Sequence, residues 1–166
     1  MEQVPEEERF YDNVTIMTQA IHQCIMNLFK AGYQTINPDL VQLAATLMNF
    51  YDRHELIQGF IENSHKTCWD NIKARNEIFF VDNASDIFKY LPMDKVNLFK
   101  DLFLTKDKDG QSVVDDELKD CIWKLFDAMV KISIKYIAKH KRSRISFYNE
   151  IELERHAKIW KIELKI

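Results

Sequence analysis

Part of the spacing of a calcium-binding loop occurs in the run TKDKDGQSVVDD, residues 105–116. Such loops carry oxygen ligands at positions 1, 3, 5 and 12, glycine at position 6 and an aliphatic residue at position 8. With Gly110 at position 6, two aspartates fall at positions 3 and 5. Thr105 and Asp116 occupy positions 1 and 12, and a serine occupies position 8, so ligand charge is lost. We expect a polar turn between two helices, closed by glycine, and no calcium site.

A second candidate for metal binding is the E-x-x-H pair formed by Glu62 and His65. Di-iron bundle proteins use two such pairs together with two further inward glutamates, and this sequence has only one pair. His65 is also three residues from Cys68, but no second close pair is present to complete a tetrahedral zinc site. We expect a solvated helix face at Glu62 and His65, and we predict no metal and no cofactor.

Catalytic signatures are also missing from the sequence. It has only three glycines and contains no Walker A, GxGxxG or GxSxG motif. Loops that cradle phosphates or present a nucleophile need glycine where the backbone approaches a ligand or adopts positive φ. The five histidines are scattered, so none pairs with a nucleophile by sequence position. We therefore predict no catalytic residue and a protein that is not an enzyme.

Apolar residues recur at spacings of three and four along most of the chain, which is typical of amphipathic helices. Stop and start signals separate these segments, such as Gly32 and the Asn37-Pro38 pair. The predicted fold class is mainly α, a bundle of about six to seven helices. The expected helices span 14–31, 37–48, 53–63, 64–81, 83–91, 93–104 and 115–140.

The C-terminal 22 residues have a different pattern. WKIELKI, residues 160–166, alternates apolar and charged residues, and ISFYNEIEL before it alternates with Asn149 as the exception. A C-terminal β-hairpin is favoured by this period of two, and a helix is the alternative. We divide the chain into an acidic lead-in over 1–12, a helical domain over 13–141 and a basic C-terminal segment over 142–166. This last segment packs on the domain or on a partner.

Charge is distributed unevenly along the chain. Residues 135–166 hold nine Lys and Arg against four Glu, a net +5, and the remaining 14 basic and 22 acidic residues give −8. Such a basic end could dock on an acidic protein surface or contact nucleic-acid phosphates. A pI near 6.0 favours a protein partner over nucleic acid, because nucleic-acid-binding proteins are usually basic. Nucleic-acid association through 135–148 is the alternative. The predicted partner-binding residues are Lys139, Lys141, Arg142, Arg144, Phe147, Tyr148 and Trp160.

Three further sequence features bear on the cell compartment in which the protein is found. The N-terminus, MEQVPEEERF, is acidic and lacks the apolar run of a signal peptide. No apolar run is long enough to cross a bilayer, so we expect no membrane insertion. Cys24, Cys68 and Cys121 are widely spaced in apolar segments, which indicates buried free thiols. The expected location is an intracellular, reducing compartment.

One region also resembles known sequences. The run LIQGFIENSHKTCWDNIKARNEIFFVDNASDIFKYLP, with VNLFKDLFL and VKISIKYI after it, covers roughly residues 56–137. It is similar to uncharacterised small helical proteins of large nucleocytoplasmic DNA viruses. The resemblance implies a virus-encoded accessory or virion-associated protein, located in the host cytoplasm or the virion, and carries no active site. We expect a non-enzymatic protein that binds other chains, itself or virion proteins. The residues that carry the resemblance are Trp69, Arg75, Asn76, Phe79, Phe80 and Asn83.

Overall fold

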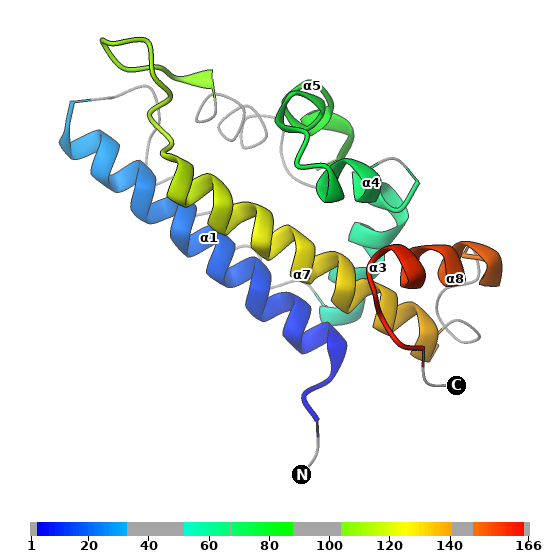
Figure 1. Cartoon of the computed structure of the whole chain (residues 1–166). Helices are drawn as coiled ribbons and strands as arrows, with labels where there is room; N and C mark the ends of the chain where they lie inside the picture. Colours follow the sequence, from blue (N-terminus) through cyan, green and yellow to red (C-terminus); the bar gives the residue numbers. More distant parts are fainter. Residues whose placement is uncertain (1–2, 33–51, 67, 88–103, 141–147, 165–166) are drawn as a thin grey trace.

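The computed structural model describes residues 3–32, 52–66, 68–87, 104–140 and 148–164 (Figure 1). Within these residues the fold is mainly α, as predicted, and the only β pairing is an isolated bridge between Lys106 and Ser112. The predicted helices at 37–48 and 93–104 lie outside the described residues, except for Leu104. The helices are α1 (Glu6–Lys30), α3 (Arg53–Ser64), α4 (Cys68–Lys73), α5 (Glu77–Ile87), α7 (Asp116–His140) and α8 (Glu150–Ile159).

The two longest helices, α1 and α7, run antiparallel and make the most extensive helix–helix contact (Figure 1). α1 begins at Glu6, so the prediction of a lead-in over 1–12 is wrong from that residue onward. Two physical reasons explain the earlier start. Three glutamates in the first turn stabilise the positive end of the helix dipole. In addition, Phe10 is only 1% exposed and its ring lies 5.2 Å from that of Phe60.

Helix α3 packs against α1, and α4 and α5 follow it in the chain. Asp52 caps α3 by accepting hydrogen bonds from the backbone N–H groups of His54 and Glu55. The single helix predicted over 64–81 is instead two helices, with the break at Arg75, whose φ is 52°. Asn76 then caps α5, because its side-chain oxygen accepts the N–H of Phe79. α5 continues to Ile87, so no separate helix starts at residue 83.

The C-terminal segment is also helical. The favoured prediction of a hairpin is wrong, and the alternative, a helix, is what forms. Asn149, the exception in the alternating pattern, is the N-cap of α8, and its side chain accepts the N–H of Glu152. Tyr148, Leu153 and Trp160 join the main apolar core of the molecule. The described part of 142–166 therefore packs on the body of its own chain.

Candidate functional site

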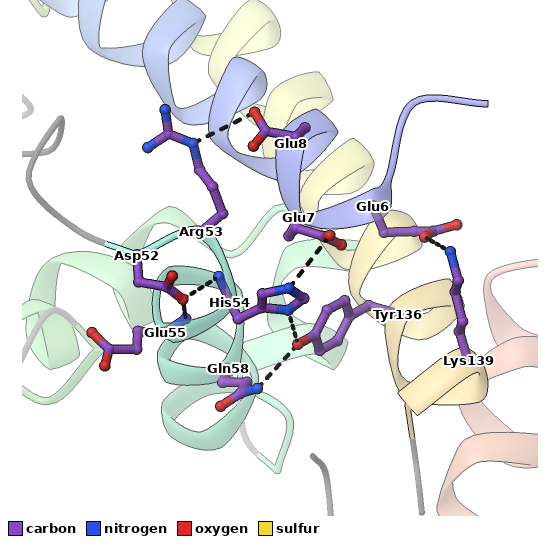
Figure 2. Close-up of polar contacts among 10 residues, drawn as sticks. All are labelled: Glu6, Glu7, Glu8, Asp52, Arg53, His54, Glu55, Gln58, Tyr136 and Lys139. Carbon is purple, nitrogen blue, oxygen red and sulfur yellow. Dashed lines mark hydrogen bonds and ion pairs between the residues drawn. The ribbon is translucent and has the colours of Figure 1, made fainter. Parts of the chain in front are cut away.

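Polar side chains gather where the start of α1, the start of α3 and the end of α7 meet (Figure 2). The Tyr136 hydroxyl accepts a hydrogen bond from Gln58 Nε2 at 3.0 Å and lies 2.8 Å from His54 Nδ1. On the other side of the imidazole ring, His54 Nε2 is 3.5 Å from Glu7 Oε1. These contacts form one hydrogen-bonded chain that links three helices.

A carboxylate, an imidazole and a hydroxyl in line are the parts of a nucleophilic triad. Here the hydroxyl belongs to Tyr136, which is 0% exposed and already engaged by Gln58. The His140 ring covers it further, with its centroid 4.4 Å from that of Tyr136. A substrate carbonyl would have no path to this oxygen. The group therefore acts as a clasp between helices, which we call the His54 clasp (Glu7, His54, Gln58 and Tyr136).

Ion pairs surround the His54 clasp and involve one of the predicted partner-binding residues. Lys139 Nζ lies 3.5 Å from Glu6 Oε2, and Arg53 Nε lies 3.5 Å from Glu8 Oε2 (Figure 2). The lysine side chain is 59% exposed, so this pair contributes about 0–1 kcal/mol. The acidic start of α1 thus lies beside the basic end of α7 and offsets part of its charge.

A second cluster contains two buried histidines, one after α3 and one on α8. His65 is 3% exposed and His156 is 1% exposed. The His65 ring lies 4.9 Å from that of Tyr148, and the His156 ring lies 4.9 Å from that of Trp69. The prediction of a solvated face at Glu62 and His65 is therefore wrong for His65. We call His65, Trp69, Tyr148 and His156 the α8 cluster.

Burial governs the acid–base behaviour of the α8 cluster. It lowers the pKa of both histidines, because a charged imidazolium would lose its hydration there. For His65 the carboxylate of Glu152, 3.9 Å from Nδ1, opposes that shift without cancelling it. Burial also raises the pKa of the Tyr148 hydroxyl. At neutral pH all three side chains are uncharged.

The other predicted partner-binding residues divide into two groups. Tyr148 and Trp160 are 6% and 2% exposed, so the prediction that they contact a partner is wrong for the folded chain. Their rings fill the contact of α8 with α4 and α7, and Lys73 Nζ lies 4.8 Å above the Trp160 ring. The remaining predicted residues lie outside the described part of the chain: Lys141, Arg142, Arg144 and Phe147.

The loop that resembles a calcium site forms a tight turn. Asp107 Oδ1 accepts hydrogen bonds from the N–H groups of Asp109 and Gln111, at 2.9 and 3.0 Å. Gly110 adopts φ 80°, a conformation that glycine reaches without strain. The prediction of a polar turn closed by glycine is confirmed. Within the described ranges, no group of three His, Cys, Asp or Glu side chains is arranged to hold a metal ion.

The three thiols are free, but they differ in exposure. Cys68 is buried and Cys24 is half-buried, in keeping with the prediction. Cys121 is exposed, so the prediction of a buried thiol is wrong there. It lies on the outer face of α7, together with the exposed charged side chains of that helix.

On this outer face of α7 acids come first and lysines follow, and Asp120 and Lys124 form an ion pair at 2.9 Å where the two signs meet. Asp116 and Glu117 are exposed at its start, and lysines are exposed along the rest of the helix. The exposed lysines are Lys124, Lys131, Lys135 and Lys139. Their spacings of seven, four and four residues place them on one stripe. We call Asp116, Glu117 and these lysines the α7 charged face.

Sequence reasoning missed both histidine clusters. His54 and Tyr136 are 82 residues apart, so no local spacing could pair them. The same holds for His65 and His156, which are 91 residues apart. Within the described ranges, no helix is both long and apolar enough to cross a membrane. Comparison of the chain with protein-family models, curated proteins and solved structures found no match.

Proposed function

We propose that this chain is a non-enzymatic protein that works by binding other protein chains. The observation that carries the proposal is the α7 charged face, with acids at one end and lysines at the other. Glu117 and Lys135 are 18 residues apart, which is about 27 Å along a helix. The Debye length at physiological salt is about 8 Å, so each end presents its own field to solvent.

A partner with both signs of charge fits this face better than one of uniform charge. Nucleic acid is uniformly negative, and Glu6 lies 3.5 Å from Lys139 at the lysine end of the face. Tyr148, buried in the α8 cluster, has no ring face to offer a base. A protein surface can place cations opposite Glu117 and carboxylates opposite Lys135, which gives both attraction and register.

The chemistry of the described histidines supports a binding role as well. The His54 clasp and the α8 cluster both hold helices together, and the hydroxyl of Tyr136 is enclosed. The resemblance over 56–137 supports a virus-encoded protein, for which a minor structural component of the particle is the role we infer. Such a protein would work in the host cytoplasm or within the virion.

A charge-reversal experiment tests the proposal. Lys131→Glu/Lys135→Glu changes the α7 charged face, and Lys108→Glu makes the same kind of change in the exposed turn after α5. We expect the native mass of the assembly, measured by light scattering with proteins of the native source present, to fall in the double variant. The Lys108→Glu control should assemble as the wild-type chain does. Equal assembly by all three proteins would exclude the α7 charged face as the partner-binding surface.

Nucleic-acid association is the second candidate function, because lysines such as those of the α7 charged face also bind phosphates. It predicts DNA or RNA binding that weakens steeply between about 50 and 200 mM salt. It also predicts that Lys131→Glu/Lys135→Glu lowers this binding and that Lys108→Glu does so much less. Absence of binding at the lower salt concentration would remove this candidate.

A further inference from the structure

The contact between α8 and the rest of the molecule is mainly apolar, and two histidines are buried in it. Trp69, Leu153, Ala157 and Trp160 supply the apolar side chains, all of them buried. His65 and His156 stand among these side chains, where a neutral residue of similar size would fill the space equally well. Two ionisable groups with ordinary pKa values near 6.5 thus occupy the contact that holds the last helix.

The hydrogen bonds of His156 define its protonation state. Its Nε2 lies 3.1 Å from Nη2 of Arg155, and a guanidinium has donors only. Nε2 must therefore accept, which places the single ring proton on Nδ1. That N–H points to the Tyr148 hydroxyl oxygen, its hydrogen-bond partner. A second proton on Nε2 would face the N–H of Arg155, so the geometry fits a neutral ring and opposes the charged one.

His65 occupies the other end of the same contact. Its ring packs against the rings of Tyr148 and Trp69, with centroids 4.9 and 6.5 Å away. The carboxylate of Glu152 is 3.9 Å from Nδ1, which is longer than a hydrogen bond, and its side chain is 33% exposed. Protonation of His65 would therefore be compensated only in part.

Among the described residues, charged groups on three elements act on the two rings. From α3 and the residues after it come Glu62 and Lys66, and from α4 comes Asp70. From α8 come Glu152 and Arg155. Asp70 and Arg155 are 56% and 50% exposed, so water screens them. Burial therefore dominates over these charges at both rings.

We propose that the α8 cluster is an acid-sensitive latch, in which protonation of His65 and His156 releases α8 from a body that stays folded. α8 has only ten residues, so its opening exposes far less buried surface than unfolding of the whole domain. Local opening of such a short element costs less free energy than global unfolding. Release uncovers Trp69 and Trp160, two large apolar side chains that neutral pH keeps buried.

The sign and size of the effect follow from proton linkage. The pKa of each histidine is lowered in the closed state and returns to about 6.5 when α8 is released, so the open state binds more protons. Stability of the closed state is full above pH of about 6.5 and is lost as pH falls below it. At a pH of about 5, each histidine raises the open fraction up to about 30-fold, and both together up to about 1000-fold.

Amide hydrogen exchange on the full chain tests the latch. Protection factors, corrected for the intrinsic pH dependence of exchange, are measured at pH values of about 7 and 5. We expect those of α8 to fall on acidification, by up to about 1000-fold, while those of α1 and α7 hold. A wild-type α8 that keeps its protection, or an α7 that loses protection equally, would overturn the proposal.

Glutamine variants identify the groups that titrate. Glutamine can donate and accept as a neutral imidazole does, but it takes up no proton. In His65→Gln/His156→Gln we expect the same α8 protection at both pH values, and each single variant should show a smaller fall than wild type. His22→Gln, a matched change on α1 outside the cluster, should retain the full fall. An undiminished fall in the single variants would overturn the proposal, even if the double variant did not fold.

Discussion

The His54 clasp makes a prediction that can be worked out from its distances. Tyr136→Phe removes one oxygen that joins Gln58 at 3.0 Å and His54 at 2.8 Å. A hydrogen bond of this kind contributes about 1 kcal/mol net, so two contribute about 2 kcal/mol. Some of that is recovered, because His54 is 24% exposed and can bind water instead. We expect a loss of about 1–2 kcal/mol in the free energy of unfolding.

Thermal and urea unfolding, followed by circular dichroism, measure this loss. For a chain of this size about 1 kcal/mol corresponds to a change of about 2–4 °C in Tm, so a loss of about 1–2 kcal/mol should lower Tm by about 2–8 °C. The urea m-value should stay the same, since the substitution changes no buried apolar surface. A double-mutant cycle with Gln58→Leu then isolates the contact between the two side chains.

The double-mutant cycle tests whether the hydrogen bond between Gln58 and Tyr136 stabilises the folded chain. We expect Tyr136→Phe and Gln58→Leu to be non-additive by about 0.5–1 kcal/mol, because each removes the same hydrogen bond. If the two losses in stability were strictly additive, the hydrogen bond would contribute nothing to the free energy of unfolding. A Tyr136→Phe protein as stable as wild type would show that packing of the ring alone holds α3 to α7.

Three further predictions test other parts of the fold. Trp160→Ala should lower the free energy of unfolding by about 3–5 kcal/mol in urea titrations, since its 2% exposed indole fills the α8 contact; a loss under about 1 kcal/mol would contradict its burial. Arg75→Gly should be less destabilising than Arg75→Ala in the same assay, because φ is 52° at this position; the reverse order would disprove the assigned backbone. A chromogenic thiol reagent should modify Cys121 first, then Cys24, and Cys68 only on unfolding. Cys24 is slower than Cys121 because burial raises its pKa. Early reaction of Cys68 would contradict its burial.

The helices that the sequence predicted best have strong periodicity and a clear end signal. For α3, the prediction over 53–63 differs from the structure by one residue, because Asp52 is a capping residue placed just before the apolar pattern. For α7, the prediction over 115–140 differs by one residue at its start. In both cases local chemistry and tertiary packing favour the same structure, which is when pattern reasoning succeeds.

The errors arose where a local pattern competed with a distant contact. The alternation near the C-terminus favoured strands, but a strand needs a neighbour, and the described core offers the rings of Trp69 and His65 instead. The break at Arg75 interrupts an apolar pattern that continues through it, so only the backbone angle reveals it. The lead-in prediction weighed acidic composition and overlooked Phe10, one apolar residue whose partner lies 50 positions later.

The pairing of α1 with α7 has a consequence for how the chain is made. The apolar side of α1 is complete by Lys30, but its partner helix ends only at His140. At about 5–20 residues per second, the ribosome needs roughly 6–22 s to synthesise the intervening stretch. During that interval α3, complete by Ser64, can already cover Phe10, but the side of α1 that packs on α7 has no partner. This apolar side stays exposed on the nascent chain until the second long helix has been made.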